Sequence, residues 1–142
     1  MQTMLSTLVW TVALATACGG SSPTPPAPPP PPPPPPAPIP GDLLVSVSGL
    51  ATTDGALLMT VGGAPITAVT ATNTANRLVS TGLAQTTLRV ILSGTLANGD
   101  VFKISVPDVA KVSSYTVAID AVADRETFAL GDLSKYGATV HR

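Results

Sequence analysis

The sequence has few of the side chains on which catalysis and metal binding usually depend. Its 142 residues include one cysteine and one histidine. A single cysteine excludes an internal disulfide and the usual zinc sites. The histidine, His141, stands next to the end of the sequence, and chain ends are seldom held rigidly. We therefore expect a tail residue there rather than the base of a Ser-His-Asp arrangement.

Charged residues are also scarce, and their signs nearly balance. Seven Lys and Arg stand against eight Asp and Glu. Nucleic acid would require a basic patch, which this composition does not supply. The sequence contains no P-loop and no dinucleotide fingerprint, and Gly62-Gly63 indicates a turn. These absences predict a protein that is not an enzyme and needs no cofactor.

The N-terminal segment has the features of an export signal. Residues 4–15 are apolar, too short for the roughly 20 residues that span a bilayer but suited to a signal peptide. The sequence Ala15-Thr16-Ala17-Cys18 follows, and it resembles the bacterial lipobox. This resemblance implies that Cys18 is lipidated and becomes the first residue of the mature chain. The sequence departs from the usual lipobox at Ala15, a position where leucine is preferred.

A second interpretation of the same segment stays open. Ala15-Thr16-Ala17 also fits the A-x-A rule of ordinary signal peptidase, which would release a secreted protein with an unmodified Cys18. A lone thiol in an exported protein calls for an explanation, and lipidation supplies one. We predict lipidation and a place in the bacterial cell envelope, with secretion as the alternative. Because Gly19 rather than aspartate follows the cysteine, the resemblance implies the outer membrane.

Proline dominates the segment that follows the cysteine. Pro28 to Pro36 is unbroken, and most other residues between Pro23 and Pro40 are proline. Such a chain adopts the extended polyproline II conformation, in which residues 23–40 would reach roughly 55 Å. The sequence therefore divides into a signal peptide (1–17), a lipidated cysteine with a proline-rich linker (18–40) and a folded domain (41–142).

Residues 41–142 alternate between apolar and polar side chains, as half-buried strands do. The expected strands cover residues 43–48, 56–61, 66–72, 88–93, 101–106 and 115–120. Short strands at this spacing predict an all-β fold, a single antiparallel β-sandwich.

Turn residues lie between these segments. Asn98-Gly99 predicts a hairpin that joins residues 88–93 to 101–106. We also expect a short helix near residues 78–85 or 109–113.

The order of the strands resembles a known family. Residues 55–61, 66–71, 87–92 and 99–106 are similar in pattern to cohesin-like modules, and residues 115–123 resemble their closing strand. Cohesins share a jelly-roll sandwich with some carbohydrate-binding modules. The resemblance implies that fold and identifies no functional residue.

Two groups of side chains are candidates for ligand binding. Sugar-binding surfaces usually stack aromatic rings on the sugar. After the predicted signal peptide the sequence contains the rings of Phe102, Tyr115, Phe128 and Tyr136. By alternation Phe102 and Tyr115 point inward, and Tyr136, beside Lys135 and Gly137, is the ring expected at the surface and the candidate ligand contact. The carboxylates of Asp120, Asp124 and Glu126 are the densest in the sequence and could ligate calcium. The ordinary interpretation is a solvated strand end.

These observations predict a membrane-anchored lipoprotein that displays a small β-sandwich. Its expected partner is another envelope or extracellular protein, and its role is protein–protein interaction or envelope structure. The alternative is a carbohydrate-binding module whose ligand is a polysaccharide. A neutral domain without nucleic-acid motifs is not expected to bind nucleic acid.

Overall fold

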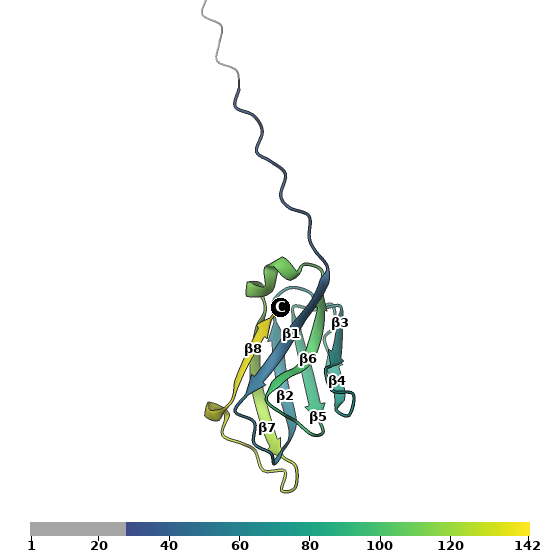
Figure 1. Ribbon diagram of the computed structural model, residues 1–142, viewed down its shortest axis with the longest axis vertical. Coiled ribbons are helices and arrows are strands. Elements are labelled where there is room, and N and C mark those ends of the chain that lie inside the picture. Colours follow the sequence, from purple (N-terminus) through teal and green to yellow (C-terminus); the bar gives the residue numbers. More distant parts are fainter. Residues whose placement is uncertain (1–27) are drawn as a thin grey trace, which may run out of the picture. The chain divides into compact units, whose positions relative to one another are not determined.

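The computed structural model describes residues 28–142 (Figure 1). The predicted signal peptide, Cys18 and the first part of the linker lie outside these residues. Residues 28–34 are exposed and carry neither helix nor strand. Residues 35–142 form a compact unit of their own. Among the described residues, no helix combines the length and apolar character that crossing a membrane requires.

Within residues 35–142, eight strands form two antiparallel sheets of four strands each. Sheet A has the order β3-β6-β1-β8, and sheet B has the order β4-β5-β2-β7. The strands are β1 (Gly41–Ser48), β2 (Asp54–Gly62), β3 (Ala68–Ala71), β4 (Arg77–Thr81), β5 (Thr87–Ser93), β6 (Gly99–Val106), β7 (Thr116–Asp124) and β8 (Gly137–His141). Two short 3-10 helices accompany them, η1 (Val109–Ser114) and η2 (Leu133–Lys135). The predicted all-β sandwich is confirmed.

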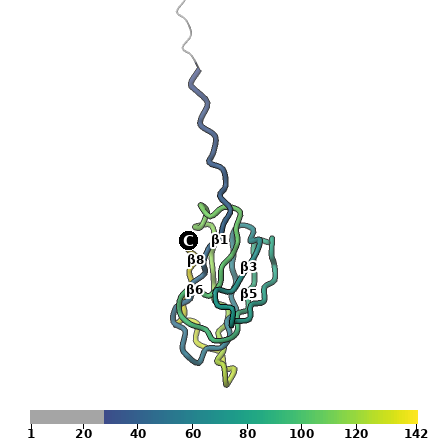
Figure 2. The backbone as a smooth tube through the Cα atoms, turned by 45° about the vertical axis from the view of Figure 1, so that its right-hand side comes forward, coloured from purple at the N-terminus to yellow at the C-terminus, as the bar shows by residue number. Residues whose placement is uncertain are grey.

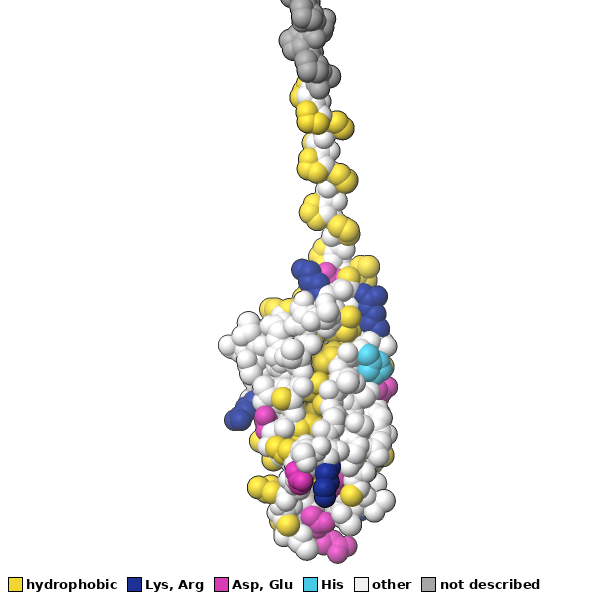
Figure 3. All heavy atoms as spheres, turned by 90° about the vertical axis from the view of Figure 1, so that its left-hand side faces the viewer, with side chains coloured by type: hydrophobic (Ala, Val, Ile, Leu, Met, Phe, Trp, Pro, Cys, Tyr) yellow, Lys and Arg dark blue, Asp and Glu magenta, His cyan; other side chains and the backbone are white. Residues whose placement is uncertain are grey.

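One apolar core fills the space between the sheets. The predicted alternation is confirmed, because every second residue of the central strands points inward. The buried apolar side chains of these strands are Leu43, Val45, Val47, Leu57, Met59, Val61, Leu88, Val90, Leu92, Val101, Phe102, Ile104 and Val106. On the side of the domain where β7 and β8 lie, apolar side chains form a strip along its length, and charged side chains flank this strip and gather near its ends (Figure 3).

The strand pairs are nested. β1 pairs with β8, β2 with β7, β3 with β6 and β4 with β5. Two further pairs, β1 with β6 and β2 with β5, complete the sheets. Of the consecutive strands among residues 41–141, β4 and β5 alone are neighbours in one sheet, and every other connection crosses to the opposite sheet. Each half of the chain therefore depends on the other for its hydrogen bonds.

The hairpin predicted at Asn98-Gly99 is wrong, because β5 belongs to sheet B and β6 to sheet A. The two residues instead make a crossing between sheets. Gly99 has a φ of +112°, which favours glycine. The Asn98 side chain binds the loop after β1, accepting from the Leu50 N–H at 2.8 Å and donating to the Leu50 carbonyl at 3.3 Å. Two alternating segments joined by Asn-Gly are compatible with a hairpin and with a crossing between sheets, so this sequence pattern does not distinguish the two.

The other local predictions fare differently. The helix expected near residues 109–113 is confirmed as η1. The alternative helix near 78–85 is wrong, because Arg77–Thr81 is the strand β4. The final strand β8 was not predicted.

The end of the linker is attached to the domain. The Val109 N–H donates to the Ile39 carbonyl at 2.8 Å, and the Ile39 N–H donates to Asp108 Oδ1 at 3.3 Å. The same Asp108 oxygen accepts from the Ala110 N–H and so caps η1. η1 lies at the end of the sandwich where β1 begins, and the loop between β7 and β8 lies at the opposite end (Figures 1 and 2). The chain thus enters the domain through a fixed residue.

Candidate functional site

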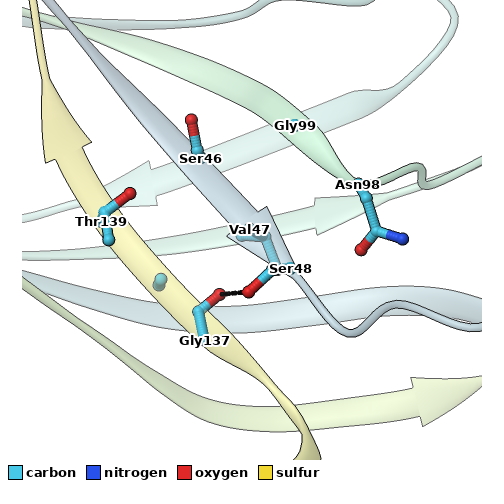
Figure 4. A pocket seen from close by; sticks show the side chains of 8 residues that line it. Ser46, Val47, Ser48, Asn98, Gly99, Gly137 and Thr139 are labelled. Atoms are coloured by element: carbon cyan, nitrogen blue, oxygen red, sulfur yellow. Dashed lines mark hydrogen bonds between the residues drawn. The ribbon is translucent and has the colours of Figure 1, made fainter.

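A shallow hollow of about 360 Å³ lies where β1 and β8 meet the start of β6 (Figure 4). Its walls carry hydroxyl and amide groups from Ser46, Ser48, Thr139 and Asn98. Glycines at both sides of the hollow leave it open. The lining carries no charged side chain, and most of its surface is apolar despite these hydroxyl and amide groups.

Much of this hydrogen-bonding capacity serves the fold. Both ends of the Asn98 amide bind Leu50. The Ser48 hydroxyl donates to the Gly137 carbonyl at 3.4 Å, and this bond joins β1 to the start of β8 (Figure 4). The hollow is thus mainly a consequence of how three strands are held together.

A polar cluster from three strands lies beside this hollow. His141 Nε2 of β8 is 2.9 Å from Asp100 Oδ1 of β6 and 2.8 Å from Ser46 Oγ of β1. The Ser46 hydroxyl also donates to Asp100 Oδ1. His141 is therefore not a loose tail residue, and that expectation is wrong. It was wrong because the sequence analysis did not foresee β8, which holds the histidine in place.

This cluster differs from a serine hydrolase relay in one decisive way. In that relay the serine and the carboxylate bind opposite nitrogens of the imidazole. Here Ser46 and Asp100 both meet Nε2, while Nδ1 lies 3.0 Å from the Arg142 carbonyl. The serine proton is held by Asp100 rather than by the ring. The arrangement joins three strands and does not activate the hydroxyl as a nucleophile.

Folding changes the proton affinity of both ionisable members of the cluster. The Arg142 carbonyl and then Asp100 raise the pKa of His141 above its ordinary value of 6.5, because both accept from the protonated ring. The Ser46 hydroxyl and then His141 lower the pKa of Asp100 below its ordinary value of 3.8. The cluster therefore stabilises the fold most when the imidazolium and the carboxylate are present together.

We expect this stabilisation to depend on pH. The histidine contribution is complete below pH 6.5 and is lost as the pH rises through the raised pKa. The aspartate contribution is complete above pH 3.8 and is lost as the pH falls through the lowered pKa. His141→Ala should therefore lower the urea midpoint at about pH 5 more than at about pH 8.

Lys103→Ala is the matched control for this measurement. Lys103 Nζ lies 3.0 Å from Asp42 Oδ2 on the same sheet, and the exposures of this pair, 44% and 41%, match the 44% and 39% of the histidine pair. This pair contains no histidine, so the effect of Lys103→Ala should be equal at the two values. An equal effect of His141→Ala at both values would contradict the prediction.

Tyr136 does not stand free at the surface as expected. The ring is half-buried against the core, and its hydroxyl donates to Asp54 Oδ1 at 3.3 Å. Burial and the nearby Asp54 raise its pKa. Among residues 28–142, the exposed aromatic ring is that of Phe128, at 78%. Phe102 and Tyr115 are buried, which confirms their expected orientation.

The three carboxylates considered for calcium do not converge. Asp120 accepts from the Thr60 hydroxyl at 2.6 Å. Asp124 Oδ1 caps a turn by accepting from the Glu126 N–H at 2.9 Å and the Thr127 N–H at 2.8 Å. These backbone donors lower the pKa of Asp124 to about 2. Among residues 28–142, no three acidic, histidine or cysteine side chains gather as metal ligands.

Comparisons with family models, curated proteins and solved structures each give no match. The resemblance to cohesin-like modules therefore stays a prediction, and no relative indicates the function of this chain.

Proposed function

We propose that this protein is a non-enzymatic binding module, displayed at the bacterial cell envelope on a proline-rich linker and anchored by lipid at Cys18. The lipobox-like sequence before Cys18 supports the anchor. Gly19 after the cysteine favours the outer membrane. The domain acts by contact with an envelope or extracellular protein, or by contributing to envelope structure.

The observation that carries this proposal is the linker and its attachment. Residues 28–40 are exposed at every position, and most of them are prolines that resist collapse. Hydrogen bonds of Ile39 with Asp108 and Val109 then fix the point at which the linker enters the sandwich. A semi-rigid spacer with a fixed end suits a domain that is presented to a partner.

A binding role fits the polar side chains better than catalysis does. The only histidine shares one ring nitrogen between Ser46 and Asp100, and so lacks the geometry of a general base for that serine. The polysaccharide alternative relied on an exposed Tyr136, whose hydroxyl is engaged by Asp54. Contact with another protein is therefore the better-supported form of binding.

The anchor is tested by replacing Cys18 in the full chain. Wild-type protein expressed in a bacterial host is expected to incorporate labelled palmitate and to sediment with membranes. Cys18→Ser should abolish the label, because serine lacks the thiol that carries the lipid. It should also release the protein once ordinary signal peptidase cleaves after Ala15-Thr16-Ala17.

The matched control for the anchor is Ser22→Ala, which should retain both label and sedimentation. Labelled Cys18→Ser protein would contradict lipidation at Cys18. An intact mass that shows a free thiol at Cys18 would favour secretion instead.

A further inference from the structure

The outer face of sheet B carries a row of apolar side chains that nothing in the domain covers. Val79 of β4 pairs with Ile91 of β5, which pairs with Leu58 of β2, which pairs with Ala121 of β7. Val79 is 45% exposed and Ile91 is 48% exposed. Apolar groups that line up across a whole sheet and face water are typical of an interaction surface.

The two halves of this face differ in side-chain size. Val79 and Ile91 are the large exposed apolar side chains of β4 and β5. Towards β7 lies a hollow of about 130 Å³, which Ile91 borders and which Leu57, Leu58, Ala56, Ala121 and Ala123 also line. The surface therefore combines large side chains on one half with a hollow towards the other.

The charges on this face are divided in the same way. The basic residues are Arg77 of β4 and Arg89 of β5. Neither arginine takes part in the ion pairs found within residues 28–142, which are Asp42–Lys103 and Asp100–His141. The acidic group lies on β7. The register of β2 and β7 shifts between Leu58 and Met59, which leaves Asp120 as the extra residue of a bulge. Its hydrogen bond with Thr60 holds its carboxylate on the outer face.

We propose that this face of sheet B binds a second copy of the same chain, related by a twofold axis parallel to the strands. A half-turn about that axis exchanges the β4 side with the β7 side and keeps each cross-strand row in place. Ile91 then lies over Leu58 of the second copy, and Val79 lies over its Ala121. The large side chains of each copy meet the hollow of the other.

The same half-turn brings opposite charges together. Thr60 stands between Arg89 and Asp120 in one row across the sheet. The rotation places Arg89 over Thr60 and Asp120 of the second copy. By symmetry the same contact forms a second time, from the second copy to the first. A twofold axis across the strands, along the row of Ile91, would instead place Arg89 over Ser93 and beside Arg77 of the second copy. Two sheets packed face to face within about 30° of alignment also follow a common packing mode.

The complementary halves lie on a single face, and this identifies the occupant as a second copy rather than a different protein. Isologous contact requires a surface that matches itself after rotation, and this face does so in both shape and charge. The inference goes beyond the proposed function, because it does not depend on lipid at Cys18. A shared membrane anchor would raise the effective concentration of the copies and strengthen the contact.

Residues 35–142 contain the whole core and form a compact unit, so they are the material for the test. They also lack Cys18, which excludes disulfide-linked dimers. Sedimentation equilibrium should give a dimer. Ile91→Glu should raise its dissociation constant about a hundredfold, because it places a charge at the centre of the apolar row. Leu133→Glu, at a residue of η2 that is 41% exposed, is the matched control and should change nothing.

Charge exchange tests the orientation of the two copies. Arg89→Glu alone and Asp120→Arg alone should each raise the dissociation constant about tenfold, because each opposes like charges twice. An equal mixture of the two variants should form a heterodimer of nearly wild-type affinity, since every contact then joins opposite charges.

Three outcomes would overturn the inference. The first is a wild-type domain that stays monomeric up to about 1 mM. The second is a dimer that Ile91→Glu does not weaken while circular dichroism shows the variant to be folded. The third is a mixture of Arg89→Glu and Asp120→Arg that associates no better than either variant alone.

Discussion

Replacing Phe102 with alanine is expected to lower the free energy of unfolding by about 3–5 kcal/mol. Phe102 is fully buried between the sheets, where it is the largest of the fully buried side chains of the described domain. Its removal loses the transfer free energy of the ring and leaves a cavity that rigid strands fill only in part. For a domain of this size the melting temperature should fall by about 15 °C or more. Urea unfolding and calorimetry measure both quantities.

Phe128→Ala is the matched control for this effect. The Phe128 ring is 78% exposed, so its removal should change the free energy of unfolding by less than about 0.5 kcal/mol. Similar losses in the two variants would contradict the assignment of Phe102 to the centre of the core.

Replacing Asp54 with alanine is expected to lower the free energy of unfolding by about 2–3 kcal/mol. Asp54 is the one charged side chain buried among the described residues, at 5% exposure. Its Oδ2 accepts from the Ala51 N–H at 2.8 Å, and its Oδ1 accepts from the Tyr136 hydroxyl at 3.3 Å. Alanine would leave both donors without a partner in a place that water reaches poorly. Urea unfolding at neutral pH measures the loss.

Two further variants locate the origin of that loss. Tyr136→Phe removes only the longer hydrogen bond and should lower the free energy of unfolding by at most about 1 kcal/mol. Asp132→Ala removes an exposed aspartate that caps η2 through Ser134, and its effect should be smaller than that of Asp54→Ala because water replaces the carboxylate. An Asp54→Ala variant no less stable than Asp132→Ala would contradict a structural role for Asp54.

The strands in the middle of the sheets were predictable from the sequence. Leu43, Val45 and Val47 alternate with polar residues because one face of β1 is buried and the other is not. The same physical pattern marks β2, β5 and β6. The edge strands β4 and β8 were missed, because no residue of either strand is fully buried and neither shows clear alternation in the sequence. The edge strand β3 is buried equally little, but its β-branched residues predicted it.

The polar clusters could not be predicted for a different reason. Ser46, Asp100 and His141 meet only because β1 lies between β6 and β8. Alternation specifies which face of a strand is buried and does not specify which strands are neighbours. The contact between Asp54 and Tyr136 likewise joins positions 82 residues apart. Its one sequence signal was a lone aspartate at the start of an apolar strand.

The nested order of the strands also sets how the chain must fold. Ser46 and His141 are 95 residues apart in the sequence and lie on adjacent strands. Loops of such length close slowly, so domains built on distant pairings fold in milliseconds to seconds rather than microseconds. When a polypeptide passes through a translocation pore N-terminus first, β1 emerges well before β8. During that time β1 lacks the strand with which it pairs. On the export route proposed above, the sandwich would therefore stay open until β8 has emerged.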